Sequence, residues 1–422
     1  MPENTPASLA DWLIYLEALH PKSIELGLER VNTVRIALQL QPSVPVILVG
    51  GTNGKGSACA FLETMLAAAG HKVGLYTSPH LLRYNERIRI DRNEIDDMAL
   101  CTAFAAVEAA RGTVSLSYFE FGTLAAVWLF DRAEVDVMVL EVGLGGRLDA
   151  VNVFAPACAI ITSVDIDHTE YLGDTREKIG FEKAGIFRAD CPAICGEATP
   201  PQSLTLHAAT IGANLRIIGQ AFSIVTGISD WHYIGQREYR YLPNPGMVGR
   251  YQLNNAACAI AALETLEKCL PVSEEAIRQG LQTARVAGRF QILPGQPEVI
   301  LDVAHNPHAA AALAANLQAR PRSGKTLALM GMLADKDIDG VVQAMHTEVD
   351  DWVLVSLDVP RGATAQVLHD ALCRIDVRGS IICSENVANG WLLACERTSE
   401  NDRICVFGSF YTVSQVLQLT GR

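Results

Sequence analysis

The segment VILVGGTNGKGS, residues 46–57, combines an apolar run with glycines, a lysine and hydroxyl side chains. The glycines allow main-chain N–H groups to approach a ligand closely. Lys55 adds a mobile positive charge, and Ser57 a hydroxyl that can serve a phosphate or a magnesium ion. The match to GxxxxGK[ST] is imperfect, because Val49 and Gly56 replace a glycine and the hydroxyl residue. We still predict a nucleotide-phosphate site rather than a structural turn.

A second lysine segment, SGKT at residues 323–326, is closer to the literal ending of that motif. Polar residues precede it, and the strand-like run TLALM follows it. Phosphate loops need a helix N-terminus after the glycines, because its free N–H groups and dipole favour an anion. We therefore predict that residues 323–326 do not bind a nucleotide.

Charged and polar residues also follow other apolar runs. Glu141 ends VDVMVL, where a carboxylate can hold Mg²⁺ directly or through water, or can remain a solvated strand end. Asp165, Asp167 and His168 follow AIITS, and this cluster is ambiguous by itself. Ser78, in YTSPHLLRYNERIRI, offers an oxygen ligand. These residue types are consistent with metal-assisted phosphate chemistry.

Lys183 lies in REKIGFEKAGIF, among small and apolar residues. The ordinary interpretation of such a lysine is a surface side chain whose stem covers apolar neighbours while its amine reaches water. The local sequence favours this interpretation, and it leaves a functional lysine as the alternative.

The elements that would position these residues alternate along the chain. Strand-like runs are expected at 46–49, 73–76, 135–140 and 157–162, with helix-period segments between them. Ala58 to Ala69 has helical apolar spacing, and Gly70 follows at a C-cap position. Such alternation predicts an α/β fold with a largely parallel, buried sheet. Ligands bind at the carboxyl ends of such strands.

The length of 422 residues favours two domains. Turn formers interrupt the pattern in VAGRFQILPGQPEV, and the alternation then resumes with five further strand-like runs. We predict a first domain over residues 1–286, a linker over 287–297 and a smaller α/β domain over 298–422. Residues 200–250 are less regular, and antiparallel strands are one interpretation of them.

The composition narrows the class of partner. The formal net charge of −13 argues against a nucleic acid or an anionic membrane surface and favours small molecules. The 11 cysteines are scattered, which is typical of buried thiols in a reducing compartment. The first residues lack a signal-peptide pattern, and no apolar run reaches roughly 18 residues. We expect a cytoplasmic protein.

Several segments together resemble the folylpolyglutamate synthase family of the Mur ligase superfamily. They occur in the family's order, namely GTNGKGS, YTSPHLLRYNERI, YFEFGTLAA, LEVGLGGRLDAVN, DIDHTEYLG, EKAGIF, GRFQ and DVAHNPH. GTNGKGS alone indicates only the superfamily, whereas the set is specific. With flanking segments that also match, the resemblance covers residues 23–412. The resemblance implies a Mur-ligase-like P-loop ATPase domain followed by a smaller Rossmann-like domain.

The activity implied by the resemblance is ATP-dependent addition of L-glutamate to dihydropteroate and to reduced folates through an acyl phosphate. A folylpolyglutamate synthase without activity on dihydropteroate is the alternative within the family. A cell-wall ligase of the superfamily fits less well, because no extra N-terminal domain is evident. A P-loop NTPase switch would hydrolyse ATP without glutamate. The implied cofactors are ATP and two Mg²⁺ ions, with K⁺ as a further candidate, and the implied state is a monomer.

The family's functional residues carry over by matching segment. The implied nucleotide contacts are Thr52, Asn53, Gly54, Lys55, Gly56, Ser57, Asn255, Arg289 and Asp302. The implied metal ligands are Ser78, Glu141, His168 and Lys183, the last as a carbamate. The implied acceptor contacts are Ile24, Glu25, Leu26, Gly27, Ser117, Tyr118, Phe119, Glu120, Leu148, Asp149 and Ala150, and the glutamate contacts are His305, Asn306 and Ser409. Lys55, Lys183 and His305 are the implied catalytic residues.

Two departures from the family pattern are visible. AVN replaces the more common ATN after Asp149, and Tyr411 stands where relatives often have histidine. Neither departure removes an implied ligand, so the resemblance implies the same class of reaction. The two positions bear only on which acceptor substrate is preferred.

Overall fold

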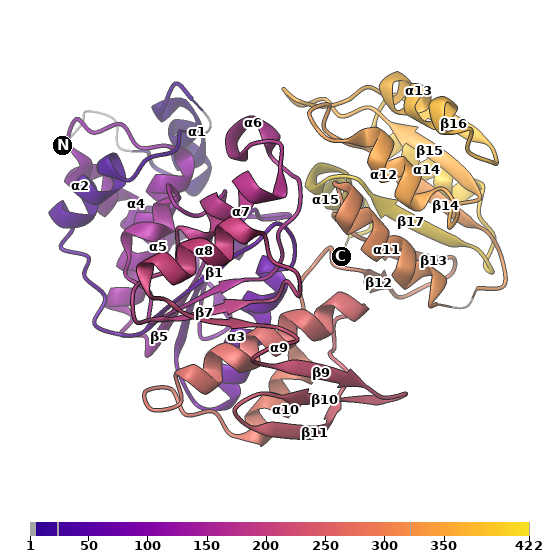
Figure 1. Ribbon diagram of the computed structural model, residues 1–422. Helices are drawn as coiled ribbons and strands as arrows, with labels where there is room; N and C mark the ends of the chain where they lie inside the picture. Colours follow the sequence, from indigo (N-terminus) through magenta and orange to yellow (C-terminus); the bar gives the residue numbers. More distant parts are fainter. Residues whose placement is uncertain (1–5, 23–24, 321, 422) are drawn as a thin grey trace. The chain divides into compact units, whose positions relative to one another are not determined.

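The computed structural model describes residues 6–22, 25–320 and 322–421. Ile24, one of the implied acceptor contacts, lies outside this part of the chain. The chain forms two compact units, residues 1–246 with 253–284 and residues 247–252 with 285–422 (Figure 1). Within the described ranges, no helix is long and apolar enough to cross a membrane.

The main sheet of the first unit has eight strands in the order β4-β3-β2-β5-β1-β6-β7-β8. Their bounds are β1 Val46–Gly50, β2 Val73–Tyr76, β3 Ile88–Ile90, β4 Asn93–Glu94, β5 Val137–Glu141, β6 Cys158–Ile161, β7 Pro192–Cys195 and β8 Asn214–Ile217. The strands pair in parallel from β2 across to β8, and β3 and β4 add an antiparallel edge. Every residue of β1 is buried, which explains its continuous apolar sequence.

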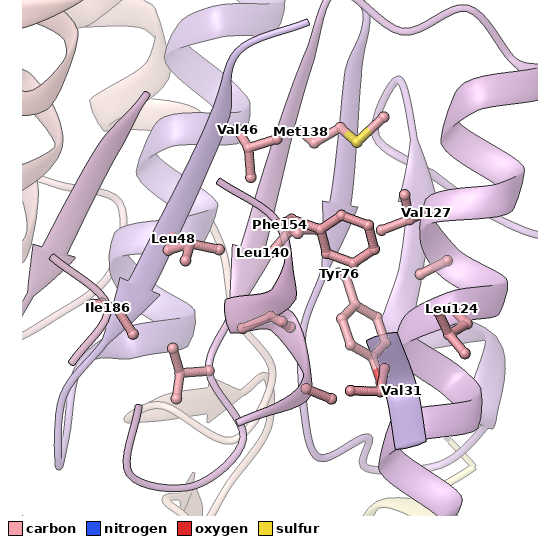
Figure 2. Close-up of a cluster of buried hydrophobic side chains, with 14 of the residues drawn as sticks. Val31, Val46, Leu48, Tyr76, Leu124, Val127, Met138, Leu140, Phe154 and Ile186 are labelled. Atoms are coloured by element: carbon pink, nitrogen blue, oxygen red, sulfur yellow. The ribbon is translucent and has the colours of Figure 1, made fainter. Parts of the chain in front are cut away.

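Helices cover both faces of this sheet. Val46, Leu48 and Leu140 belong to a core cluster with Leu124 of α5, Tyr118–Arg132 (Figure 2). Helix α3, Lys55–Ala68, contacts the same strands but adds no side chain to that cluster, so it covers the opposite face. The other elements are α1 Leu9–Leu19, α2 Glu29–Ala37, η1 Tyr84–Arg87, α4 Asp97–Arg111, η2 Ala150–Val153, α6 Thr169–Leu172, α7 Arg176–Ala184, α8 Gln202–Ile211, α9 Arg250–Thr265 and α10 Glu274–Thr283.

The less regular region near residue 230 forms a small antiparallel sheet, as one interpretation of the sequence anticipated. Its strands are β9 Ser223–Thr226, β10 Asp230–Ile234 and β11 Glu238–Pro243, with β10 in the middle. Glu264 of α9 accepts hydrogen bonds from the Tyr233 hydroxyl and from main-chain N–H groups of the β10–β11 turn. This buried carboxylate attaches the small sheet to α9.

The second unit has a six-stranded sheet in the order β12-β13-β17-β14-β15-β16. Its strands are β12 Gln291–Leu293, β13 Glu298–Leu301, β14 Thr326–Met330, β15 Asp351–Val355, β16 Ile381–Ser384 and β17 Arg403–Phe407. Its helices are α11 Pro307–Gln318, α12 Ile338–Met345, α13 Ala365–Ile375, α14 Val387–Glu396 and α15 Phe410–Leu419. All neighbours pair in parallel except β12, which is antiparallel to β13.

The segment predicted as a linker, residues 287–297, differs from that prediction. Residues 291–293 form β12, and the turn formers at 294–297 connect β12 to β13 as a hairpin. The linker prediction was therefore wrong for this stretch, because the same turn residues can end a domain or close a hairpin. Contacts assign residues 285–297 to the second unit.

Candidate functional site

The loop between β1 and α3 depends on two glycines. Gly54 has φ +86°, and a Cβ built on it would lie 2.4 Å from the Asn255 side-chain oxygen. Gly51 has φ +145°, and its Cβ would lie 2.0 Å from the Thr162 hydroxyl. Larger residues would be strained in this conformation and would collide with their neighbours. The loop therefore turns tightly into the N-terminus of α3, as the sequence predicted.

Residues that follow β6 hold this loop in place. Thr52 donates its main-chain N–H to the Ser163 carbonyl, and Asn53 donates its own to the Ser163 hydroxyl at 3.0 Å. The Thr162 hydroxyl donates to the Asn53 carbonyl at 2.6 Å. The Thr52 hydroxyl bonds to the main chain of Asp165. Thr162 and Ser163 were not among the residues predicted from sequence, although a polar pair at the end of an apolar strand was the available signal.

Lys55 begins α3 and folds back over its own loop. Its Nζ donates to the carbonyl of Gly51 at 3.2 Å and to that of Thr52 at 3.3 Å. The Gly54 cap position supplies no side-chain hydrogen bond to the start of the helix. A positive side chain and main-chain N–H donors therefore lie together, which is the arrangement that binds phosphate oxygens. Ser57, in the first turn of α3, is buried.

Glu141 and Ser78 lie next to this loop. β5 pairs with β1, with Glu141 opposite Val49. Ser78 follows β2 and donates its main-chain N–H to Glu141 Oε2 at 3.2 Å. A Cβ on Gly56 would lie 3.7 Å from the same oxygen. The strand order β2-β5-β1-β6 therefore brings a carboxylate, a serine and the phosphate loop to one edge.

Lys183 is buried in α7, with 3% of its surface exposed, so its interpretation as a surface lysine was wrong. Burial lowers the pKa of the Lys183 amine to about 7, and the charge of Lys55 acts in the same direction. Asp167 and Asp149 oppose this shift. A lysine with such a pKa is partly neutral at physiological pH, and its amine can react as a nucleophile.

His168 lies at the cap position of the short helix α6 with φ +51°. Its main-chain N–H bonds to Asp167 Oδ1 at 2.8 Å. Within the described residues, no group of three or more His, Cys, Asp and Glu side chains is arranged as a metal site. The implied ligand set contains only two side chains of these types, Glu141 and His168, together with Ser78 and Lys183.

The acceptor segments lie in the first unit. Gly27 donates its main-chain N–H to the Leu148 carbonyl at 3.3 Å, which joins two of the segments. The Phe119 ring packs against Tyr76, with ring centroids 5.7 Å apart. Ser117 and Glu120 form a capping box at the start of α5. Of the other described members, Glu25 and Leu26 are partly buried, the Tyr118 ring meets Tyr84 edge-on, and Ala150 and Asp149 are buried.

Asp149 has partners within its own loop. Oδ2 accepts from the Leu144 N–H at 2.8 Å, and Oδ1 accepts from the Val151 N–H at 3.1 Å. Burial raises the pKa of Asp149 to about 7, and these main-chain hydrogen bonds limit the rise. The carboxyl group therefore organises the loop 144–151, a role that the sequence analysis did not assign to it.

The implied site residues of the second unit gather at the carboxyl ends of β13 and β17. Asp302 accepts from the Phe290 and Ala304 N–H groups, both at 2.8 Å, and burial raises the pKa of its carboxyl group. The Arg289 guanidinium lies over the Phe410 ring. Asn306 and Ser409 cap α11 and α15, respectively.

His305 lies beside Asn306 in the same unit. Its Nδ1 is 2.8 Å from the Val303 carbonyl, an acceptor that favours a proton on Nδ1. Its ring centroid is 6.3 Å from that of Phe410. The ring therefore lies near the residues at the ends of β13 and β17.

Comparison with known proteins agrees with this arrangement. Residues 49–195 match the model of the Mur ligase middle domain, and residues 288–410 match that of the Mur ligase glutamate ligase domain. The chain is 47% identical over 413 residues to the dihydrofolate synthase/folylpolyglutamate synthase of Escherichia coli K12, covering 97% of this chain and 95% of the relative.

Solved structures give the same result. A structure of E. coli FolC in complex with DHPP and ADP matches this chain with a TM-score of 0.94 and 46% sequence identity. The match covers 99% of each chain. A bifunctional folylpolyglutamate synthase/dihydrofolate synthase with Mn, AMPPNP and L-glutamate bound has a TM-score of 0.92 and 46% identity, covering 99% of this chain and 100% of the other.

The fold and the two matching domain families together define the chain as a ligase of the Mur type. Within that class, the chain belongs to the dihydrofolate synthase/folylpolyglutamate synthase family. The α/β fold class and the family resemblance predicted from sequence are both confirmed.

Proposed function

We propose that this chain is an ATP-dependent ligase that adds L-glutamate to dihydropteroate and to reduced folates. The observation that carries this proposal is the joint position of Lys55, Glu141 and Ser78 at the edge of the sheet. A relative that carries both activities in its name, at 47% identity, supports the choice of substrates. The E. coli structure with DHPP and ADP gives the same support for the ligands.

All three substrates, namely the acceptor, ATP and L-glutamate, are anions, so the main requirement of the reaction is the stabilisation of negative charge. The acceptor carboxylate attacks the γ-phosphorus of ATP, ADP leaves, and an acyl phosphate forms. The α-amine of glutamate then attacks the acyl carbon, phosphate leaves, and the amine loses a proton. Lys55 and the N–H groups at the start of α3 stabilise the transferred phosphoryl group.

The nucleotide contacts in the first unit are assigned to residues 52–57 and Asn255. Asn255 lies against Gly54 and so faces the loop that carries Lys55. Arg289 and Asp302, both in the second unit, are proposed as nucleotide contacts from their matching segments. The hydrogen bonds of Asp302 to main-chain N–H groups fix its carboxyl group in one orientation.

Ser78, Glu141 and His168 are assigned as ligands of Mg²⁺, which would neutralise charge on the phosphates. The relative with Mn and AMPPNP bound supports a divalent cation. Lys183 is assigned as a carbamate that helps to hold a second Mg²⁺. Its burial and lowered pKa favour the neutral amine that adds to CO₂. K⁺ is a further candidate cofactor.

The substrates are assigned to separate groups of residues. Residues 24–27, 117–120 and 148–150 hold the pterin end of the acceptor, where Phe119 offers an aromatic face. His305, Asn306 and Ser409 hold L-glutamate. The net charge of −13 supports small molecules as partners, and not a nucleic acid or a membrane. The proposed state is a monomer, and the proposed location is the cytoplasm.

The test is product formation, measured by mass spectrometry, with dihydropteroate and a reduced folate monoglutamate supplied separately. Each reaction contains ATP, Mg²⁺ and L-glutamate, and controls omit one of these at a time. Glutamylation of both acceptors is the expected result. Product from the folate alone would identify a folylpolyglutamate synthase, and ATP consumption without either product would refute the assignment.

A further inference from the structure

Arg30 connects two of the three acceptor segments. It lies near the start of α2, in the stretch 23–31 that resembles the family's acceptor region, but it is not one of the implied acceptor contacts. Its Nη2 donates to the Glu25 carbonyl at 3.0 Å and to Glu120 Oε1 at 3.1 Å. Its Nη1 lies 3.3 Å from Glu25 Oε1. One guanidinium therefore joins the 25–27 segment to the first turn of α5.

The core fixes the position of this guanidinium. Val31, the next residue, is completely buried, and it belongs to the same core cluster as Tyr76 and Leu124 (Figure 2). Helix α2 contacts both α5 and η2, which begins at Ala150. Arg30 is therefore placed by packing and not only by its hydrogen bonds.

Glu120 depends on Arg30 for its charge balance. Its side chain is 4% exposed. Oε2 accepts from the Ser117 N–H at 2.7 Å within the capping box, and Oε1 accepts from Arg30. A buried carboxylate is costly unless a cation and hydrogen bonds compensate it. The capping box also sets the start of α5, from which Tyr118 and Phe119 extend.

Glu25 has more basic side chains near its carboxylate than Glu120 has. Its Oε2 lies 3.0 Å from His20 Nε2, and Oε1 lies 3.9 Å from Lys22 Nζ. The carboxylate of Glu25 is thus engaged within the protein. The same segment reaches the third acceptor segment through the hydrogen bond between Gly27 and Leu148.

We propose that Arg30 is a positioning residue for the acceptor, which holds the 25–27 segment against the start of α5. The proposal rests on the assignment of these segments to the pterin end of the acceptor. Loss of Arg30 should let the 25–27 segment move away from the first turn of α5. Binding of the acceptor should then weaken, while the loop that carries Lys55 is unaffected.

The experiment measures KM for each substrate in Arg30→Ala and Arg30→Lys. Alanine is the best helix former, so the first variant preserves α2. For Arg30→Ala we expect KM for dihydropteroate and for reduced folate to rise by about tenfold or more, with KM for ATP within about twofold. Arg30→Lys keeps the positive charge but loses the planar guanidinium with its several N–H donors. Its KM for the acceptor should therefore lie between those of the wild type and Arg30→Ala.

Two comparisons show whether Arg30 positions the acceptor segments or only stabilises the folded protein. Lys22→Ala removes an exposed cation 3.9 Å from Glu25 and should leave every KM unchanged. The pair Arg30→Ala and Glu120→Gln should be non-additive in acceptor KM, because the two residues share one contact. Thermal unfolding reports the folded fraction, which affects apparent kcat but not KM.

Several outcomes would overturn the proposal. An unchanged acceptor KM in Arg30→Ala would show that Arg30 only stabilises the fold. An equal rise in KM for ATP would place its effect at the phosphate loop. If the wild type turns over both acceptors normally, either result refutes this inference alone. If the wild type neither binds dihydropteroate in calorimetry nor converts either acceptor, the proposed function fails with it.

Discussion

Residues 50–57 and residues 323–326 both contain a glycine-lysine pair, but the two segments have opposite surroundings. Lys55 begins a helix and folds over its own loop. Lys325 precedes the strand β14, and its amine lies 3.3 Å from Asp351 with 68% of the side chain exposed. The following Thr326 is completely buried and accepts hydrogen bonds from Arg403.

The element that follows the lysine decides what each segment can do. Free N–H groups at the start of α3 are available to an anion, whereas those next to β14 bond to carboxylates. Lys325 and Thr326 donate their main-chain N–H groups to Asp402 and Asp350, respectively. A carboxylate already occupies the place where a phosphate would need to bind, so the more literal motif is the structural one.

The largest expected difference between the two segments is in turnover. Lys55→Ala should reduce kcat by about three orders of magnitude or more, because a cation at the transferred phosphoryl group is lost. The matched variant Lys325→Ala should keep wild-type kcat. Steady-state glutamate ligation measures both, and circular dichroism checks the fold. Near-normal turnover of Lys55→Ala would remove this lysine from the mechanism.

The next effect concerns Lys183, a buried lysine whose pKa is lowered in part by the charge of Lys55. Lys183→Ala should reduce activity by roughly 100-fold, as expected for loss of a group that holds a metal ion. Lys183→Glu, which supplies a carboxylate directly, is the matched variant and should recover part of this loss. Full activity with an unmodified lysine by intact mass would contradict the carbamate.

The carbamate also predicts a pH dependence. The neutral amine adds CO₂ and releases a proton, so the carbamate needs a deprotonated lysine. With the pKa lowered to about 7, roughly 90% of the amine is neutral at pH 8, against about 0.3% at an ordinary pKa of 10.5. The ¹³C carbamate signal with labelled bicarbonate should therefore fall as the pH drops through about 7. A signal that stays constant from pH 8 to pH 6 would contradict this prediction.

A smaller contrast comes from the glycines before each lysine. Gly54→Ala would force a Cβ to 2.4 Å from Asn255 at φ +86°, and we expect KM for ATP to rise about tenfold or more. Gly324→Ala would place its Cβ 2.3 Å from Asp402 and 2.5 Å from the Asn401 carbonyl. It should lower the unfolding temperature without changing KM for ATP. Equal effects on KM would contradict the distinction between the segments.

The sequence predicted nine strands of the two units because their apolar patterns are local, but it did not predict β3, β4, β7, β8 or β12. The strands at 73–76 and 326–330 have the predicted bounds, and the others begin and end within about two residues of them. The rule that parallel strands share one binding edge also predicted that Glu141 and the phosphate loop lie together. Their separation along the chain did not matter for this prediction.

The partners of these residues could not be predicted in the same way. Ser163 holds Asn53 only because β6 lies beside β1, and alternation of strands and helices does not specify that order. The same limit applies to Arg30 and Glu120, which lie on different helices. The motif residues were thus accessible from sequence, while the residues that fix their positions needed the fold.

The smallest effect tests whether residues 323–326 are purely structural. The Thr326 hydroxyl accepts from Arg403 Nε at 3.2 Å and from Nη2 at 2.9 Å, while Arg403 is 2% exposed. Thr326→Val keeps the shape but removes the acceptor, so the free energy of unfolding should fall by about 1–3 kcal/mol. Thr326→Ser retains the hydroxyl and should lose less. Urea unfolding measures both variants, and each should keep the wild-type KM for ATP. A raised KM in Thr326→Val alone would mean that this segment also contributes to nucleotide binding, and the contrast with residues 50–57 would no longer hold.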